Sequence, residues 1–175
     1  MVLQVKRFAP DARLARAAVD DVKRKLDRLV NKAPTFRVDA VRPSPAPAEP
    51  GVYVLSEGNR SLYVGRTGNL RARLADHRSS TVERATLAVK LARTTAGRPA
   101  TYRRGTSARK LYDNDLTFRA AFQRARARIS AMRVRYVVVA EDEDDGVRQA
   151  LLETYAAVTL RTRERDGGFN NFRNH

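Results

Sequence analysis

The chain has 175 residues, with 35 lysines and arginines against 19 aspartates and glutamates, two histidines and no cysteine. This composition excludes a disulfide framework and a thiolate metal site, and it argues against a histidine-rich zinc site. No run of 18 apolar residues is present, so we expect no transmembrane helix. The N-terminus lacks an apolar signal-peptide core. We therefore expect a cytoplasmic protein that is large enough for one domain with a proper core.

The positive charge is concentrated in the middle of the chain. Residues 60–136 contain 19 basic and 4 acidic residues, whereas residues 1–59 contain 11 and 7, and residues 137–175 contain 5 and 8. A field of this size attracts polyanions, of which nucleic acid is the usual one. A solvated basic surface or a general bias toward arginine is the alternative, but it does not explain why only the middle is so positive.

The first 50 residues are predicted to form a helical extension and a linker. Apolar residues recur at helical spacing over residues 10–30, and Asn31 with Pro34 provides a stop. This helix needs an apolar partner, so it either packs on the rest of the chain or forms a homodimer. Residues 35–41 can form a strand. The predicted divisions are an N-terminal helical extension at 1–42, a proline-rich linker at 43–50 and a main domain at 51–175.

A hairpin and a capped helix are predicted at the start of the main domain. The β-rich runs 51–55 and 62–65 flank a turn at 56–60 that contains Gly and Asn, which is typical of a hairpin. Asn69 can then cap a helix that begins at Leu70.

The rest of the chain combines helices with a long polar stretch and one strong strand. The strand ends in an apolar run, which favours a central position in a sheet. Acidic residues at 141–145 resemble a metal site, but they are more typical of the negatively charged start of a helix. The expected elements are a helix at 80–93, a polar loop at 94–115, a helix at 116–131, a strand at 132–140 and a helix at 144–161.

Two tripeptides and two later side chains form a spaced pattern. Gly51-Val52-Tyr53 lies on the first strand of the hairpin and Tyr63-Val64-Gly65 on the second; Arg73 follows Tyr63 by ten residues, and His77 follows Arg73 by four. This pattern resembles the GIY-YIG nuclease family, with Val for Ile in both tripeptides. The resemblance implies an α+β fold with a small three-stranded, mostly antiparallel sheet flanked by helices. It also implies a metal-dependent DNA endonuclease, a hydrolase of phosphodiester bonds.

The resemblance further implies roles for individual side chains. Tyr53 and Tyr63 would stand side by side on paired strands, and Tyr53 would act on the attacking water as general base. Because a free phenol has a pKa of about 10, the base needs cationic neighbours, which Arg66, Arg73 and His77 supply. Arg73 would stabilise charge that develops on the phosphate. Taken singly, each tyrosine also fits ordinary strand packing.

Two later positions complete the implied catalytic centre. Glu153 is the one carboxylate in the mostly apolar run 150–158, so its side chain must be exposed to solvent, paired with another group or engaged in the function of the protein. The resemblance assigns to it a divalent cation, Mg²⁺ or Mn²⁺, whose other ligands would be water and phosphate oxygens. An asparagine after this helix would also belong to the centre. We prefer Asn170 over Asn171, and ordinary turn chemistry is the alternative.

Basic side chains outside the centre are candidates for contacts with nucleic acid. Residues 94–115 place two tyrosines among basic residues, which suits backbone contacts with base stacking, although a solvated loop is the alternative. We expect DNA as the partner, with RNA left open, and no membrane. A non-catalytic nucleic-acid-binding module that retains the fold is the competing interpretation. The predicted nucleic-acid-binding residues are Arg66, Arg71, Arg103, Arg104, Arg109 and Lys110.

Overall fold

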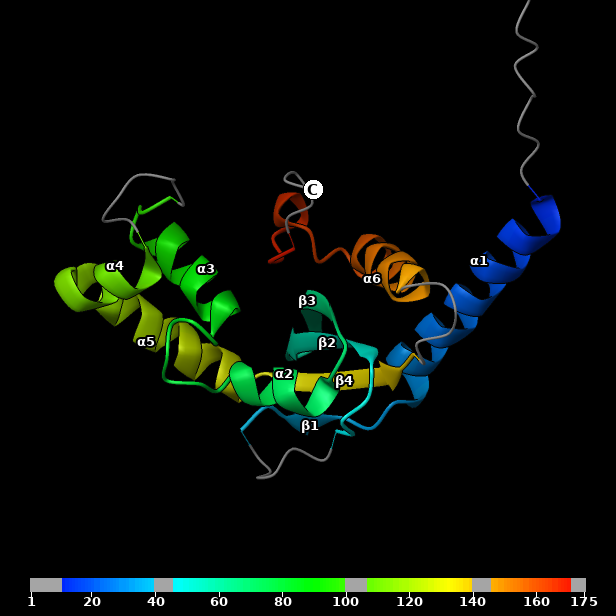
Figure 1. The fold of residues 1–175 in the computed structure, drawn as a ribbon, viewed down its shortest axis with the longest axis horizontal. Helices are drawn as coiled ribbons and strands as arrows, with labels where there is room; N and C mark the ends of the chain where they lie inside the picture. Colours follow the sequence, from blue (N-terminus) through cyan, green and yellow to red (C-terminus); the bar gives the residue numbers. More distant parts are fainter. Residues whose placement is uncertain (1–10, 40–45, 100–106, 140–145, 171–175) are drawn as a thin grey trace, which may run out of the picture.

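The computed structural model describes residues 11–39, 46–99, 107–139 and 146–170, and its centre is an antiparallel sheet with strand order β1-β4-β2-β3 (Figure 1). The strands are β1 Phe36–Arg37, β2 Gly51–Glu57, β3 Arg60–Thr67 and β4 Arg133–Val138. The helices are α1 Ala12–Asp27, α2 Leu70–Asp76, α3 Thr86–Thr95, α4 Ala108–Asn114, α5 Leu116–Ala131 and α6 Val147–Thr159. This mixture agrees with the predicted α+β class. No helix in these ranges is long and apolar enough to cross a membrane.

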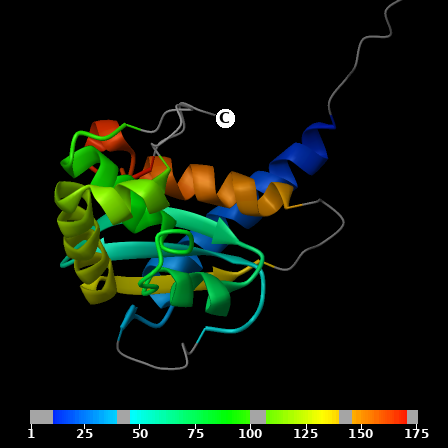
Figure 2. The same ribbon diagram turned by 60° about the vertical axis from the view of Figure 1, so that its left-hand side comes forward.

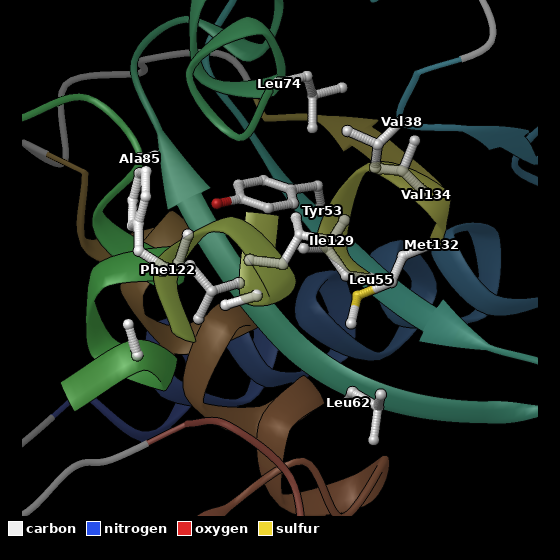
Figure 3. Packing of buried hydrophobic residues seen from close by; sticks show 14 of the residues in the cluster. Val38, Tyr53, Leu55, Leu62, Leu74, Ala85, Phe122, Ile129, Met132 and Val134 are labelled. Carbon is white, nitrogen blue, oxygen red and sulfur yellow. The ribbon is translucent and has the colours of Figure 1, made fainter. Parts of the chain in front are cut away.

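Helices cover both faces of the sheet because side chains alternate between the faces along its central strands. Val52, Val54 and Val64 belong to a buried apolar cluster that includes residues of α1 and α6. Tyr53 and Leu55 belong to a second cluster, formed with α2, α3 and α5 (Figure 3). Figure 2 shows α6 beside α1, in orange and blue, away from α5. The second cluster contains the tyrosine of the first tripeptide and therefore lies under the candidate site.

The sheet has one strand more than the resemblance predicts. Phe36 of β1 pairs with Val134 of β4, so part of the predicted strand at 35–41 becomes an edge strand of the same sheet. Val22 and Leu26 of α1 are buried in the cluster that also contains Val52. The N-terminal helix therefore packs on the sheet, which is one of the two partners predicted for it. The predicted domain divisions stay a prediction.

Local sequence signals set the beginnings of α1 and α2. Asp11 accepts hydrogen bonds from two backbone amides in the first turn of α1. Asn69 Oδ1 accepts a hydrogen bond from Ala72 N at 2.9 Å, which confirms the predicted cap of α2. The strand predicted from residue 132 is β4, and it lies between β1 and β2 as its apolar sequence favours.

Two elements of the middle segment differ from the prediction. The helix expected from residue 80 begins only at Thr86, because Ser79 and Thr81 hydrogen bond to each other in a turn instead of capping a helix. The predicted loop at 94–115 contains α4, whose first turn is capped by the Ser107 hydroxyl.

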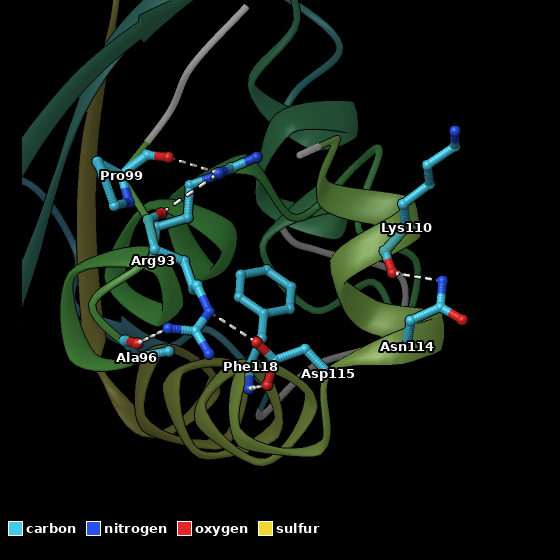
Figure 4. A network of polar contacts seen from close by, with 8 residues as sticks. Arg93, Ala96, Pro99, Lys110, Asn114, Asp115 and Phe118 are labelled. Atoms are coloured by element: carbon cyan, nitrogen blue, oxygen red, sulfur yellow. Dashed lines mark hydrogen bonds and ion pairs between the residues drawn. The ribbon is translucent and has the colours of Figure 1, made fainter. Parts of the chain in front are cut away.

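A polar network joins the end of α3 to the beginning of α5 (Figure 4). Arg98 Nε donates to Asp115 Oδ2 at 2.8 Å, and Asp115 Oδ1 accepts from Phe118 N at 3.0 Å as the cap of α5. Arg93 donates to the carbonyls of Arg98 and Pro99. These contacts fix the two helices relative to each other at this end.

Candidate active site

Tyr53 is fully buried, and its hydroxyl contacts two polar side chains. The hydroxyl lies 2.8 Å from His77 Nε2 and accepts a hydrogen bond from Arg73 Nε at 3.2 Å. Gly65 lies opposite Tyr53 on β3, and a Cβ there would stand 2.5 Å from the Tyr53 hydroxyl oxygen. The glycine of the second tripeptide therefore leaves the space that the tyrosine of the first tripeptide fills.

Burial keeps Tyr53 and His77 neutral. It raises the pKa of Tyr53 far above the usual phenol value. It lowers the pKa of His77 to about 3, and the positive charge of Arg73 adds to this effect. At neutral pH the pair is therefore a phenol and an uncharged imidazole. Because neither side chain reaches solvent, their geometry suits them to orient Arg73.

Helix α2 supplies both partners of the Tyr53 hydroxyl. Leu70 and Leu74 are buried on one face of this helix and anchor it to the core. Arg73 and His77, four residues apart, share the face that meets Tyr53, as their spacing predicts. Arg73 Nη2 also donates to Thr86 Oγ1 at 3.0 Å, so the guanidinium is held by groups from β2 and α3.

Tyr63 lies beside Tyr53 but lines an open cavity. Its ring centroid is 6.1 Å from that of Tyr53, so the two tyrosines are neighbours as predicted. Leu55 pairs with Tyr63 and Ser56 with Ser61, so β3 contains a bulge at this point, and bulges redirect side chains. The cavity has a volume of about 550 Å³ and is lined by Tyr63, Arg66, Lys90, Glu153, Phe169 and Asn170, among others.

The protonation of Tyr63 depends on its charged neighbours. Burial raises its pKa, the charge of Arg73 opposes this rise, and the Glu153 carboxylate adds to it; hydrogen bonding from Tyr53 lowers it again. The net direction is upward, so Tyr63 is a neutral phenol at neutral pH. Neutralising Glu153 would remove one of the contributions that raise this pKa.

Glu153 extends from α6 into the same cavity. Its side chain is 20% exposed, and its Oε2 accepts a hydrogen bond from Arg66 Nε at 3.1 Å. The lone carboxylate of the apolar run is therefore paired, one of the three outcomes that its sequence position predicts. Among the residues that the structure describes, no three His, Cys, Asp or Glu side chains gather as metal ligands. A single carboxylate in an open cavity fits Mg²⁺, which usually keeps several waters and accepts phosphate oxygens.

Asn170 lines the cavity, but its amide is engaged in docking the backbone. Its Oδ1 accepts hydrogen bonds from Val64 N and Thr162 Oγ1, both at 2.8 Å, and its Nδ2 donates to Val64 O at 2.7 Å. The side chain thus pairs with the edge of β3 as a neighbouring strand would. This arrangement holds the segment after α6 against the sheet.

The structure describes four of the predicted nucleic-acid-binding residues, and of these four only Arg66 lines this cavity. Arg71 Nε donates to the Ala46 carbonyl at 3.0 Å. Arg109 forms a bidentate ion pair with Glu83 at 2.9 Å, and Lys110 is exposed on α4. The predicted residues that lie outside the described ranges are Arg103, Arg104 and Asn171.

Six lining residues of this cavity are not among the predicted site residues: Thr86, Leu87, Lys90, Ala150, Thr154 and Phe169. Lys90 Nζ donates to the Phe169 carbonyl at 2.6 Å and pairs with Glu164 at 2.8 Å. Lys90 sits within an ordinary helical sequence, and nothing local distinguishes it. The one available signal for Phe169 is an aromatic residue directly after two glycines, next to the predicted asparagines.

The comparisons with known proteins give one short local similarity. A stretch of 32 residues, 18% of this chain, is 50% identical to UvrABC system protein C of Aquifex aeolicus (strain VF5), and it spans only 6% of that protein. No protein-family model and no solved structure matches the chain. The similarity covers too little of either protein to show a family.

Proposed function

We propose that the protein is a divalent-cation-dependent DNA endonuclease of the GIY-YIG type, with RNA left open as a substrate. The observation that carries the proposal is the convergence of Tyr63, Arg66 and Glu153 on one cavity, with Arg73 held beside them by Tyr53. These side chains come from the neighbouring elements β3 and α2 and from α6, where Glu153 lies 87 positions after Arg66. The short similarity to UvrABC system protein C supports a nuclease-like function.

Tyr63 is better placed than Tyr53 to activate the attacking water. The sequence-based expectation gives this role to Tyr53, but that side chain is completely buried and its hydroxyl is shared by Arg73 and His77. Tyr63 lines the cavity; burial raises its pKa, and both Arg73 and Tyr53 oppose that rise. We therefore assign the general base to Tyr63 and the positioning of Arg73 to Tyr53. Because the base must be deprotonated, the cleavage rate should rise with pH above neutrality.

Two arginines near Tyr63 suit a phosphate: Arg66 lines the cavity, and Arg73 lies close enough to Tyr63 to oppose the rise of its pKa. Arg73 is always charged, and a forked guanidinium matches phosphate oxygens. Arg66 now pairs with Glu153, and a bound phosphate would offer it a second partner. Glu153 would hold the divalent cation, which supplies charge stabilisation at the leaving oxygen when bound. The protein itself then orients the phosphate and takes the proton of the water at the Tyr63 oxygen.

Cleavage of supercoiled plasmid tests the proposal. Purified protein should nick the plasmid in Mg²⁺ and not in EDTA. Glu153→Ala should abolish cleavage while leaving retention of DNA in gels largely unchanged, because the carboxylate holds the cation and not the DNA. Loss of cleavage and DNA binding together in this variant would contradict the role assigned to Glu153.

A non-catalytic nucleic-acid-binding module is the second candidate. The observation in its favour is the Arg66–Glu153 ion pair, which already satisfies the carboxylate without a cation. Retardation of DNA without cleavage, across Mg²⁺ and Mn²⁺ and on single- and double-stranded substrates, would support this candidate over the nuclease.

A further inference from the structure

A second cavity adjoins the candidate active site. It has a volume of about 580 Å³ and lies between α3, α5 and the segment around Phe169. Lys90 and Phe169 line both cavities, so the two are neighbours at these residues. Cavities of 300–1,000 Å³ are typical of sites for small molecules and cofactors, so this one is large enough for a nucleotide.

The Phe169 ring is held in place by its backbone and by its neighbours. Phe169 N donates to Leu62 O at 2.7 Å, and the Phe169 carbonyl accepts from Lys90 Nζ at 2.6 Å. Gly168 packs on Thr162 so closely that a Cβ would stand 2.0 Å from the Thr162 carbonyl oxygen. A ring fixed in this way can receive a base at little cost in conformational entropy.

Three cations surround the second cavity. Arg128 forms a bidentate ion pair with Glu57, and its guanidinium lies 5.1 Å from the centroid of the Phe169 ring. Arg124, one turn earlier on α5, is exposed and forms no ion pair within the described residues. Lys90 also lines the cavity, but it pairs with Glu164, which lines the cavity as well. Among the described residues, Arg124 is therefore the cation of this cavity that is available to a phosphate.

Most of the remaining lining residues are small, with Leu91 and Glu164 as the exceptions. Ala121 and Ala125 of α5 are buried and line the cavity beside Phe169, whereas Thr94 and Thr95 of α3 add hydroxyl groups. A flat base fits against small residues and an aromatic ring, and a phosphate fits beside arginine. This combination is the chemistry by which proteins bind single strands, stacking bases on aromatic rings along a positive groove.

We propose that the second cavity binds one nucleotide of a single-stranded nucleic acid, adjacent to the phosphate in the candidate active site. The base would contact Phe169, and the phosphate of the same nucleotide would contact Arg124. A base stacked inside a duplex cannot enter a cavity of this kind, so the site selects single-stranded or unpaired regions. This inference deepens the proposed nuclease function and rests on it for the position of the scissile phosphate; the binding itself requires no cleavage.

A tryptophan at position 169 provides a direct probe, since the chain contains no tryptophan. In EDTA, a single-stranded oligonucleotide should quench the emission of Phe169→Trp, because stacking on a base quenches indole. Parallel titrations use DNA and RNA of the same sequence, and quenching by either sugar type supports the proposal. A blunt duplex of that sequence, and a single strand without bases, should bind without quenching. Unchanged emission when a bound single strand saturates the protein would overturn the proposal.

Two further variants separate stacking from packing and charge. Phe169→Leu keeps an apolar side chain and should weaken single-strand binding about tenfold, the effect of losing one stacked base. Arg124→Gln should weaken binding and reduce the salt dependence by about one phosphate contact. Arg126→Gln, on the same helix but outside this cavity, makes the same charge change and is the control. Wild-type affinity in Phe169→Leu, or equal effects of the two arginine variants, would reject the site.

The nuclease proposal and this inference can fail separately. All binding measurements are made in EDTA, where no cleavage is expected. Base-dependent binding at Phe169 without plasmid cleavage would retain the second cavity and remove the nuclease function. Cleavage that is unaffected by Phe169→Leu, with unchanged binding, would retain the nuclease and remove the second cavity.

Discussion

The buried Tyr53 ring occupies the space left by Gly65, which has no side chain to meet it. A Cβ at Gly65 would contact three atoms of the ring at 2.5–2.9 Å. We expect Gly65→Ala to lower the free energy of unfolding by about 2 kcal/mol or more, as overpacking of a core does. Denaturant unfolding measures this loss. Gly58→Ala is the control, because open space surrounds Gly58 and only its positive φ adds strain, about 1 kcal/mol. Equal losses in both variants would contradict the packing argument.

Arg66 pairs with the carboxylate of Glu153, to which we assign the divalent cation. The pair is partly exposed, so its free energy is that of a surface ion pair, about 0.2–1 kcal/mol. Removing Arg66 removes this ion pair from Glu153, and we expect Arg66→Ala to bind Mn²⁺ about two- to fivefold more tightly in calorimetry without DNA. Arg60→Ala, on the same strand but in contact with Asp166, should leave Mn²⁺ affinity unchanged. Weaker Mn²⁺ binding in Arg66→Ala would contradict this competition.

The neutral, buried His77 makes stability depend on pH. Its pKa is about 3 in the folded protein and near 6.5 when unfolded, so only the unfolded chain takes up this proton as the pH falls from 6.5 toward 3. Stability contributed by His77 is therefore lost on acidification, with a slope of at most about 1.4 kcal/mol per pH unit. Asp21 and Glu57 have lowered pKa values through Lys25 and Arg128, and their contributions fall only at more acidic pH.

Unfolding at pH 7, 6 and 5 measures the effect of His77. We expect the wild-type free energy of unfolding to fall across this range. His77→Gln keeps a polar side chain near Tyr53 but cannot take up a proton, so its stability should stay nearly constant between pH 7 and pH 5. A parallel decline in both proteins would assign the pH dependence to other groups.

The sequence predicts that Arg73 and His77 lie close to Tyr53, but it does not predict which of Tyr53 and Tyr63 lines the cavity. The four-residue spacing of Arg73 and His77 on a capped helix brings both to Tyr53, and this could be read from local patterns. Whether a strand tyrosine is buried or faces a cavity depends on the elements that pack over it, here α2, α3 and α6. Such packing is a tertiary feature, so the exposure of Tyr63 could not be predicted.

At the scale of elements, one side chain joins the segment after α6 to β3. Asn170 satisfies the buried amide and carbonyl of Val64, so Asn170→Ala would leave both without partners. We expect a loss of about 2–4 kcal/mol, the cost of two unsatisfied buried groups. Thermal unfolding measures it. Asn114→Ala, whose amide reaches only the exposed Lys110 carbonyl, should change stability by less than about 0.5 kcal/mol. A neutral Asn170→Ala would mean that the segment is held by other contacts.

Elements that local sequence specifies were predicted, whereas the length of an element that depends on tertiary pairing was not. The hairpin and the Asn69 cap follow from residues that are close in sequence. A strand was predicted at 35–41, but β1 contains only Phe36 and Arg37, which pair with β4 about 100 positions later. The local sequence therefore indicated this strand but not its length. Helix α4 was missed, because none of its residues is buried and it therefore shows no apolar stripe.

At the scale of the whole molecule, α1 has two different halves. Its C-terminal half buries Val22 and Leu26 against the sheet, whereas Leu14 and Val19 near its N-terminal end are 71% and 49% exposed. Packing on the sheet therefore accounts for Val22 and Leu26 but not for Leu14 and Val19, so part of the apolar pattern from which the homodimer was predicted stays exposed in the single chain. Exposed apolar side chains on a helix are the contacts that a second copy of that helix would cover.

The predicted homodimer can be tested through Leu14 alone. A dimer through α1 would bury this side chain, so Leu14→Glu should shift the protein to monomer in sedimentation velocity at micromolar concentration. Because Leu14 is exposed in the single chain, the variant should keep the thermal stability that the wild type shows when dilute. Arg13→Glu, at the neighbouring position, reverses a charge without removing apolar surface and is the control. A wild type that is monomeric at all concentrations would reject the dimer. Because Glu153 is the one carboxylate that lines the cavity within the described residues, we would then expect a monomer to cut one strand each time it binds DNA.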